Sequence, residues 1–529
     1  MRFQRQPRSA CESARGDVLG PVRGFWLGLS LAIVLLGLIT TQITLRDTDI
    51  AVYATAAERV FVAGEDPYPR RPGDVLPFTY PPTALPLLYP ISGLSLEQLG
   101  KVMLTLNLLL TVVVMVVIVG DLARDDPSGK LRLWGPLAIA GFGGLYLNLQ
   151  FGQVNLLLLL LIWGYWRALR RGREGAGAGA WLALGCVAKP HYVLLGLGAG
   201  PLPRPRLVIG GLVAGGLLIG LSLWIAPSGS WTSWWQDIVA TTSLTQLPPG
   251  HSSIAAPWNR SLAGAIARFL VPNKFSSIIA DDPALAARLT GSAILIVIGA
   301  TGVVLWRSMR RGLASDSATA SEATQVRSSA DTGMDASARS GPGTGSSAGA
   351  DAGADAGAGA DAGAGAGPGA DAGADANADA DADADATSMA RPRRTFIRAD
   401  QWSQPRGAVD HDLELSLISI AVFLISPASW THHLVLLLPA ILVLLRDRVL
   451  APGLAPSSRF AAGLVLAVLA LTIDDLIPRE IRVSSLPLMT LMTVAVIALW
   501  LLLAEQLWRR SGPRLSTETQ AATVHRHGA

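Results

Sequence analysis

Long apolar runs separated by short basic or polar stretches make up most of this chain. The first run, Phe25 to Ile43, reaches the length of about 20 residues that a helix needs to cross a bilayer. It is too long for a signal-peptide core and lacks a small-x-small cleavage site, so we expect an uncleaved first span. Further runs lie at about 101–120, 133–149, 153–166, 207–226, 289–306, 413–427, 432–446, 459–474 and 486–508.

One more apolar run, 176–202, is interrupted near its middle by Lys189-Pro190-His191 and is read as two short spans. With this run counted twice, the pattern predicts an all-α polytopic membrane protein of about twelve transmembrane helices. If the N-terminus is cytoplasmic, the Arg clusters that closely flank spans all lie inside, as the positive-inside rule requires. These clusters lie at 167–173, 203–206, 307–311, 391–394, 446–448 and 508–510. Arg70-Arg71 is the exception, and these two residues are placed to meet lipid phosphates outside.

The composition agrees with a membrane protein. Half of the residues are hydrophobic and only 16% are charged, against about 25% in soluble proteins. Two isolated cysteines support no disulfide framework or thiolate metal site. The net charge of +4 includes nine Asp in 340–390, and the basic residues elsewhere cluster in short loops. They indicate membrane topology, and we expect no nucleic-acid partner.

The same pattern divides the chain. We expect cytoplasmic tails at 1–24 and 509–529, and a first membrane region at 25–312 with external loops 44–100 and 227–288. A low-complexity Asp-Ala-Gly segment, 313–412, is predicted to be a disordered cytoplasmic linker, because it holds too little apolar surface to fold. It is either a regulatory segment or a tolerated insertion. The last helices occupy 413–508.

The predicted topology brings many polar residues to one membrane face. They lie at external span ends or in external loops, far apart in sequence, which predicts one shared polar cavity there. Each one alone is better explained as a helix cap or a snorkelling side chain, and the prediction rests on the whole set. They are Asp47, Asp49, Asn148, Gln150, Gln153, Asn155, Lys189, His191, Asn259, Arg260, His432 and His433.

The first external stretch opens with two of these carboxylates. Residues 49–63 place Ile50, Tyr53, Ala57, Val60 and Phe61 near one face of a helix, which predicts either a helix along the membrane surface or a connecting helix packed on the bundle.

These residue types offer a definite chemistry. A carboxylate can take the proton of a hydroxyl, an imidazole can orient a substrate or neutralise a phosphate, and Lys189 and Arg260 can bind an anionic leaving group. The sequence has no P-loop, no nucleotide-binding GxGxxG motif and no HExxH motif, so it does not indicate a soluble nucleotide donor. His432 and His433 make a weak metal pair, because neighbours on a helix point about 100° apart.

Several segments resemble glycosyltransferase family 87, whose members are integral-membrane mannosyltransferases that use polyprenyl-phosphate mannose. The similarity covers about 25–306 and 413–508, and the Asp-Ala-Gly segment has no counterpart in it. The similar segments are DTDIAVYATAAERVFVAGEDPY, FTYPPTALPLLYP, NLQFGQVNLLLLLLI, AKPHYVLL, WNRSLAGAIARF and SPASWTHHLVLLLPA.

The resemblance implies a helical bundle of the GT-C type and an inverting transfer of mannose from a β-linked lipid phosphate, with no cofactor or metal. It implies Asp49 as the base, with Asp47 as the alternative, and His432 and His433 in the catalytic site. The substrate-binding residues would be Asp47, Tyr80, Gln153, Asn155, Lys189, His191, Asn259 and Arg260.

We therefore expect an extracytoplasmic site in the cell membrane that takes a polyprenyl-phosphate sugar, a glycolipid or glycan acceptor and surrounding membrane lipids. The alternatives are a lipid-linked sugar transporter or flippase, a membrane assembly protein, and a transferase for another lipid-linked sugar such as arabinose. A transporter favours inverted repeats and polar residues at the membrane midplane, and the sequence shows neither clearly. The acceptor stays open between a phosphatidylinositol mannoside, a lipoglycan and another envelope glycan.

Overall fold

The structure is a computed structural model that describes residues 21–200, 204–276, 278–334, 407–471 and 485–511. Contacts divide the chain into one unit of residues 1–315 with 402–529 and a second unit of residues 316–401. Most of the predicted linker and both predicted tails lie outside the described residues. At the edges of the predicted linker, helix α12 (Pro283–Met334) continues past 313, and α13 (Ala408–Ile425) begins before 413.

The described residues are mostly helical, and their only β pairing is a single bridge between Asn259 and Trp430. From the first described residue to Arg170, the elements are α1 (Pro21–Thr40), α2 (Asp47–Glu58), η2 (Arg59–Ala63), η3 (Pro82–Ile91), α3 (Leu96–Val114), η4 (Met115–Val119), α4 (Gly120–Leu122), η5 (Ala123–Asp125), α5 (Leu131–Ala140), α6 (Gly143–Gln150) and α7 (Asn155–Arg170).

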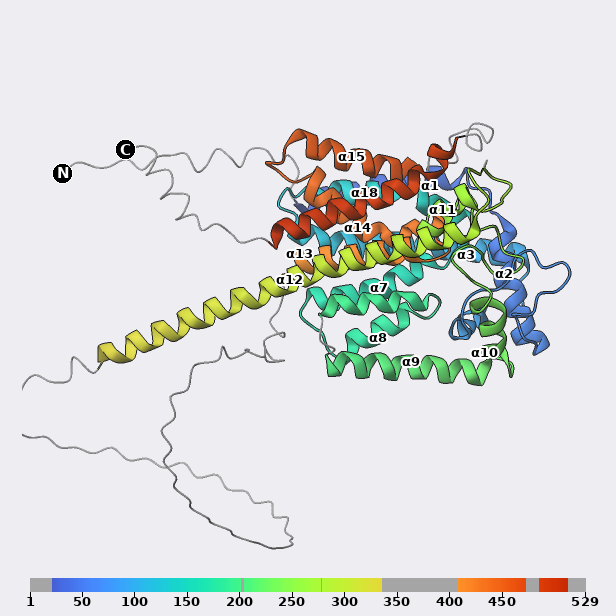
Figure 1. Ribbon diagram of the computed structural model, residues 1–529, viewed down its shortest axis with the longest axis horizontal. Helices are drawn as coiled ribbons and strands as arrows, with labels where there is room; N and C mark the ends of the chain where they lie inside the picture. Colours follow the sequence, from blue (N-terminus) through green and yellow to red (C-terminus); the bar gives the residue numbers. More distant parts are fainter. Residues whose placement is uncertain (1–20, 201–203, 277, 335–406, 472–484, 512–529) are drawn as a thin grey trace, which may run out of the picture. The chain divides into compact units, whose positions relative to one another are not determined.

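The remaining elements carry the second half of the bundle (Figure 1). They are α8 (Ala176–Gly185), η6 (Pro190–Ala199), α9 (Pro205–Ile225), α10 (Ser230–Ser233), η7 (Trp234–Val239), α11 (Leu262–Leu270), α12, α13, η9 (Thr431–Leu437), α14 (Leu438–Leu444), η10 (Leu445–Val449), α15 (Pro456–Leu471) and α18 (Leu486–Arg510).

Five helices among the described residues are long and apolar enough to cross a membrane: Val22–Thr40, Leu96–Asp125, Pro205–Ile225, Pro283–Arg310 and Leu488–Arg510. The predicted number of about twelve is therefore not confirmed. Several apolar runs form broken or short helices instead. The run 133–149 is divided between α5 and α6, and 176–202 forms α8 and the 3₁₀ helix η6. An apolar run alone does not distinguish a membrane span from a buried, irregular segment.

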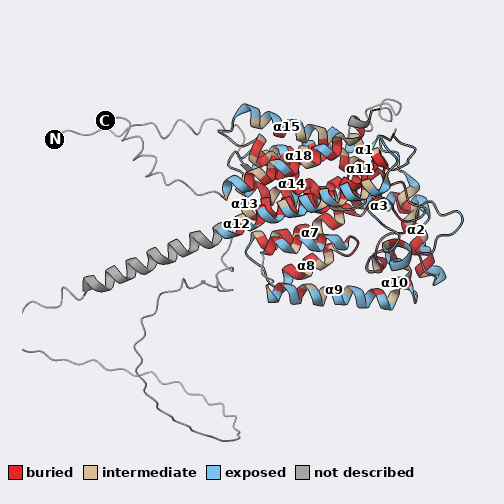
Figure 2. Ribbon diagram, in the orientation of Figure 1, coloured by how far each residue is buried: buried red, intermediate tan, exposed pale blue. Residues whose placement is uncertain are grey.

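Helix α13 forms the centre of the bundle. Every residue from His411 to Leu424 is buried, and the helix packs against α7, α14, α18 and η6. Figure 2 shows this contrast, because α13 and α14 are mostly buried whereas α9 is largely exposed. After its charged first turns, the helix is mostly apolar on all sides, which suits such a central place. The exposed apolar side chains of α1, α9 and α12 suit contact with lipid.

Helices α7, α8 and α9 lie side by side (Figure 1). Two glycines bring α8 and α9 together, because a Cβ at Gly179 or Gly210 would collide with the facing backbone. Small residues allow this kind of close approach between membrane helices.

Helix α2 is a connecting helix packed on the bundle, which is one of the two predicted readings. Ile50, Tyr53, Ala57 and Val60 of the predicted face are buried, and α2 packs against α3 and η3. The loop that follows is held in place by Arg59, whose Nη2 lies 2.6 Å from Oδ1 of Asp74. The loop therefore leads in a defined path to Tyr80 and to η3.

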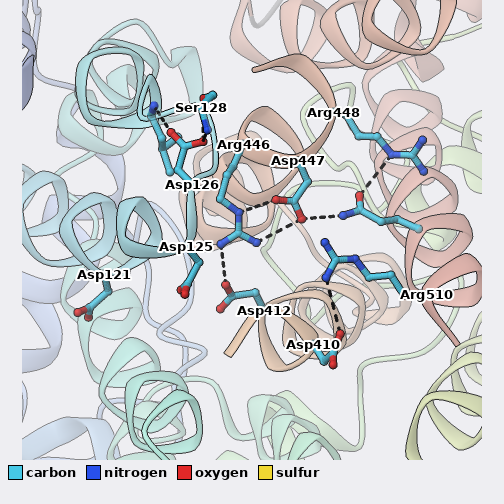
Figure 3. Close-up of polar contacts among 12 residues, drawn as sticks. Asp121, Asp125, Asp126, Ser128, Asp410, Asp412, Arg446, Asp447, Arg448 and Arg510 are labelled. Carbon is cyan, nitrogen blue, oxygen red and sulfur yellow. Dashed lines mark hydrogen bonds and ion pairs between the residues drawn. The ribbon is translucent and has the colours of Figure 1, made fainter. Parts of the chain in front are cut away.

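The far end of α7 lies in a cluster of buried charges, which we call the ion-pair cluster: Asp125, Arg170, Asp412, Arg446 and Asp447. Asp412 is fully buried and pairs with both Arg170 and Arg446, and the Arg446 Nη1–Asp412 Oδ2 distance is 2.9 Å. Arg170 also lies 2.5 Å from Asp125. Figure 3 shows Arg446 between Asp412 and Asp447. This cluster joins helices from both sides of the predicted linker.

Candidate active site

A cavity of about 680 Å³ opens beside the start of α2. Its lining comes from segments far apart in the sequence: α2, the loop before η3, the turn between α6 and α7, the Lys189 connection, η7, the loop 242–258 and the segment 426–433. A cavity of this size fits a small ligand or a sugar. Several of the polar residues that were predicted to share a cavity, such as Asp49, Gln153 and Lys189, therefore line this one.

The first wall of the cavity is built around Asp49. Gln153 Nε2 donates a hydrogen bond of 2.6 Å to Asp49 Oδ2. Gln153 Oε1 lies 3.1 Å from the hydroxyl of Tyr53 and 3.4 Å from that of Tyr80, and the two hydroxyls are 2.9 Å apart. Asp49, Gln153 and the two tyrosines therefore form one hydrogen-bonded group.

The turn that carries Gln153 depends on Gly152. Gly152 has φ +59°, and a Cβ there would lie 2.9 Å from Cγ1 of Ile50 on α2. Glycine is favoured at such a place because it has no Cβ and adopts positive φ readily. The left-handed turn that packs against α2 thus explains why a glycine precedes Gln153.

Hydrogen bonds between buried asparagine side chains hold together the helices on both sides of this turn. Asn148 donates to Asn107 Oδ1 at 3.0 Å, and Asn155 donates to Asn148 Oδ1 at 3.1 Å. All three asparagines are buried and tie α3, α6 and α7 together. Asn155 is not among the residues that line the cavity, and the substrate contact expected of it stays a prediction. Interhelical hydrogen bonds of this type hold membrane helices in register.

The second wall carries Lys189, His191, His251, His432 and His433. The rings of His432 and His433 are 4.6 Å apart at 85°, and Phe151 lies 5.4 Å from the His432 ring. His433 is close enough to Lys189 and the other three histidines for charge interaction. A search of the described residues finds no group of three or more His, Cys, Asp or Glu that could hold a metal ion.

Asn259 shapes the segment that carries the histidine pair. Its Nδ2 donates to Pro427 O at 3.0 Å, and its Oδ1 accepts from Ser429 N at 3.0 Å. Next to it, Arg260 Nε donates to Thr431 Oγ1 at 3.0 Å, and Arg260 is fully buried. Both residues lie outside the cavity lining. The substrate contacts expected of Asn259 and Arg260 stay predictions, and the contacts that the structure shows hold the segment that carries the histidine pair.

The electrostatics suit a base. Burial raises the pKa of Asp49 to about 6, and the hydrogen bond from Gln153 partly offsets this rise. A base with a pKa just below neutral pH is mostly ionised at pH 7 and still takes up a proton readily. Burial also raises the pKa of Tyr80 to about 12 and lowers that of His251 to about 4, so both side chains are neutral at pH 7.

The structure separates the predicted site residues into two groups. The cavity is lined by Asp49, Tyr80, Gln153, Lys189, His191, His432 and His433, whereas Asp47, Asn155, Asn259 and Arg260 are outside its lining. Asp47 is exposed, and neither Asp47 nor Asp49 is a side-chain cap of α2, whose N-cap is Arg46.

Sequence reasoning missed an aromatic pair in the lining. The rings of His251 and Trp430 are stacked, with centroids 5.3 Å apart and planes 7° apart. His251 follows the turn Pro248-Pro249-Gly250, and Trp430 lies two residues before His432. The place of Trp430 beside the predicted histidine pair was the available signal, whereas nothing local marks His251.

Comparison with known families decides the class of protein. The model of glycosyltransferase family 87 matches residues 78–326. The matched stretch is just under half of the chain, and it is similar to glycosyltransferase family 87. Together with the long apolar helices, this match indicates a membrane glycosyltransferase. No curated protein matches the chain, and no solved structure matches it.

The stretch that matches the family 87 model includes Tyr80, Gln153, Lys189 and His191, but not Asp49 or the histidine pair. What can be said of those three residues therefore rests on their place in the cavity and on their chemistry.

Proposed function

We propose that this protein transfers a mannosyl residue from polyprenyl-phosphate mannose to a hydroxyl of a cell-envelope glycolipid or lipoglycan, on the external face of the membrane. The observation that carries the proposal is that the lining of one cavity holds both a carboxylate that suits a base and Lys189 with several imidazoles. A transfer from a sugar phosphate needs both groups, one for the incoming hydroxyl and one for the leaving phosphate.

The steps follow from these positions. Asp49 takes the proton as the acceptor oxygen forms its bond to C1 of the sugar. The bond between C1 and the phosphate oxygen breaks, and its electron pair leaves with the polyprenyl phosphate. In this proposal Lys189, which lines the same cavity as Asp49, stabilises the negative charge of that phosphate, and His191, His432 and His433 orient it. A single displacement inverts the anomeric centre, so a β-linked donor yields an α-linked product.

The external face is supported by the arrangement of charge. The ion-pair cluster and the basic loops lie at the far end of α7, about 22 Å from the cavity by the rise per residue of a helix. By the positive-inside rule the basic end faces the cytoplasm, so the cavity faces outward. A lipid-linked donor is already in the membrane on that side, and the exposed apolar helices suit entry of its prenyl chain from the bilayer.

The test uses membranes with equal amounts of wild type, Asp49→Asn or Asp47→Asn, supplied with radiolabelled polyprenyl-phosphate mannose and a crude lipid acceptor pool. We expect label in a larger glycolipid with wild type and with Asp47→Asn, and none above background with Asp49→Asn. Asp47 is the matched control because it lies two residues away and outside the cavity lining.

Other outcomes change the proposal in defined ways. Loss of transfer with Asp47→Asn alone would move the base to Asp47. Transfer from polyprenyl-phosphate arabinose but not from the mannose donor would change the sugar. Movement of the lipid-linked sugar across the bilayer without any transfer would favour the flippase.

A further inference from the structure

Gln153 lies between the Asp49 carboxylate and two tyrosine hydroxyls, and these neighbours determine which way its amide points. A carboxylate only accepts hydrogen bonds, so the group that faces it at 2.6 Å must be the amide nitrogen. The amide oxygen then faces the hydroxyls of Tyr53 and Tyr80, either of which can donate to it. The two tyrosines thus stabilise the orientation in which Gln153 donates to Asp49.

The backbone of Gln153 is also held. Its amide nitrogen donates to Asn148 O at 3.1 Å, and the left-handed turn at Gly152 precedes it. The residue is only 4% exposed, so its amide cannot turn away into water. Rotation of the amide by half a turn would set its oxygen against the carboxylate, which is unfavourable while Asp49 is ionised.

The contact leaves one oxygen of Asp49 for chemistry. Gln153 occupies Oδ2, and among the described residues none donates a hydrogen bond to Oδ1. Asp49 lines the cavity, where an acceptor hydroxyl would lie. A base needs such an uncommitted oxygen within hydrogen-bond reach of the proton that it takes.

We propose that Gln153 is a positioning residue that holds Oδ2 of Asp49 and leaves Oδ1 to take the proton of the acceptor hydroxyl. This assignment rests on the proposed function, because it takes Asp49 as the base. It replaces the substrate contact predicted for Gln153 from the sequence. Tyr53 and Tyr80 act one step further out, by fixing the amide.

This role has an electrostatic consequence. A hydrogen bond donated to a carboxylate favours its ionised form, so the bond from Gln153 lowers the pKa of Asp49 against the rise caused by burial. A neutral, non-donating side chain at 153 removes this effect and changes no charge. The other titratable groups that line the cavity are Arg46, Tyr53, Tyr80, Lys189, His191, His251, His432 and His433.

The experiment compares full-length wild type, Gln153→Met and Gln42→Met in lipid nanodiscs. Gln42 is the matched control, because it is an exposed glutamine outside the cavity lining whose side chain donates to Thr41. The first readout is kcat/KM against pH with polyprenyl-phosphate mannose. The second is the rate at which a hydrophobic carbodiimide labels Asp49 at each pH, read by peptide mass spectrometry. Carbodiimides react with the protonated carboxyl, so this second readout titrates Asp49 without any substrate.

For Gln153→Met we expect both midpoints to rise by about one pH unit, because a hydrogen bond to a charged group is lost. We also expect kcat/KM at pH 7 to fall by about tenfold or more, since the base is no longer held in place. The control Gln42→Met should leave both midpoints and the rate unchanged. If Gln153→Met does not fold, Gln153→Glu serves instead, because a second carboxyl in contact with Asp49 must also raise the labelling midpoint.

An unchanged labelling midpoint in a folded Gln153 variant would overturn the proposal. A higher KM with unchanged midpoints would also overturn it, in favour of a substrate contact. Wild type could show no sugar transfer while the labelling midpoint of Asp49 still rises in Gln153→Met. That result would reject the donor of the proposed function and would support the hydrogen bond from Gln153 as the contact that positions Asp49.

Discussion

Helix α7 joins two kinds of buried polar chemistry. At its beginning, the carboxylate of Asp49 contacts an amide, and no ion pair is found for it within the described part of the chain. At its end, the carboxylate of Asp412 lies between Arg170 and Arg446 and also accepts from Trp166 Nε1 at 3.0 Å. Both are aspartates at the end of an apolar helix bundle, but only one has its charge neutralised by its neighbours.

The difference in ion pairing shows how a buried carboxylate suited to catalysis can be distinguished from one that stabilises the fold. A buried charge that is fully paired is stable in place, and removal of its partner leaves an expensive unpaired charge. A carboxylate that is partly buried and unpaired has a raised pKa and can exchange protons with a substrate. The four predictions below test this contrast between Asp49 and the ion-pair cluster.

The largest effect is expected on catalysis from Asp49→Asn. Loss of the base should lower kcat by about 10²–10⁴-fold. Thermal stability should not fall, because burial disfavours the ionised form of Asp49, whereas the amide that replaces it carries no charge to bury. Steady-state transfer assays and a melting curve on the same preparation check both parts. A melting point as low as that of an Asp412 variant would place Asp49 among the structural carboxylates.

The second prediction reverses the pattern. Asp412→Asn should lower the free energy of unfolding by about 3–5 kcal/mol, because Arg170 and Arg446 lose the carboxylate that they share. The kcat of the protein that remains folded should be near that of wild type. Asp410→Asn is the matched control on the same helix, since its contact with Arg510 is long, at 3.9 Å, and exposed. Size-exclusion melting curves measure the loss, and equal curves for the two variants would contradict the prediction.

The third prediction concerns pH. Asp49 must be ionised to act as a base, and its pKa is raised to about 6, so activity is present above this value and is lost as pH falls through it. We expect kcat/KM to increase by about tenfold from pH 5 to pH 7. The ion-pair cluster should not contribute to this loss of activity at low pH, so the Asp412→Asn protein that remains folded should show the same midpoint. A profile that is flat between pH 5 and pH 7 would exclude Asp49 as the titrating base.

The smallest effect is expected from a pair of glycines at the two ends of α7. Gly152 and Gly172 both have positive φ, at +59° and +64°. A Cβ at 152 meets Ile50, whereas a Cβ at 172 has nothing within 4 Å. Both alanine variants should lose about 1 kcal/mol of stability from backbone strain. Only Gly152→Ala should also lower kcat, by several-fold, because it displaces Gln153 and Asp49. Equal kcat for the two variants would show that the turn does not position the base.

Much of the candidate site was predictable from the sequence. The residues Asp49, Gln153, Lys189, His432 and His433 were expected at one face, and all of them line the cavity. The signal was the position of polar residues at the ends of apolar runs, which limits where a polar side chain can lie in a membrane protein.

The number of spans was harder to predict, because an apolar run has the same composition whether it crosses the membrane or lies inside the bundle. Helix α13 illustrates this. It carries Asp410, Asp412 and Glu414 in its first turns, and yet every residue from His411 to Leu424 is buried, with Asp412 paired to Arg170 and Arg446.

The sequence by itself determined that the chain is largely helical and apolar, and it predicted which polar residues lie at the ends of the apolar runs, because hydropathy and spacing record these directly. The tertiary structure decided which of those residues reach the cavity. Asn155, Asn259 and Arg260 turn away from it to hold helices and loops, whereas His251 and Trp430 reach it from separate segments. Side-chain direction in 3₁₀ turns and loops depends on packing between distant segments, and no local pattern in the sequence contains that information.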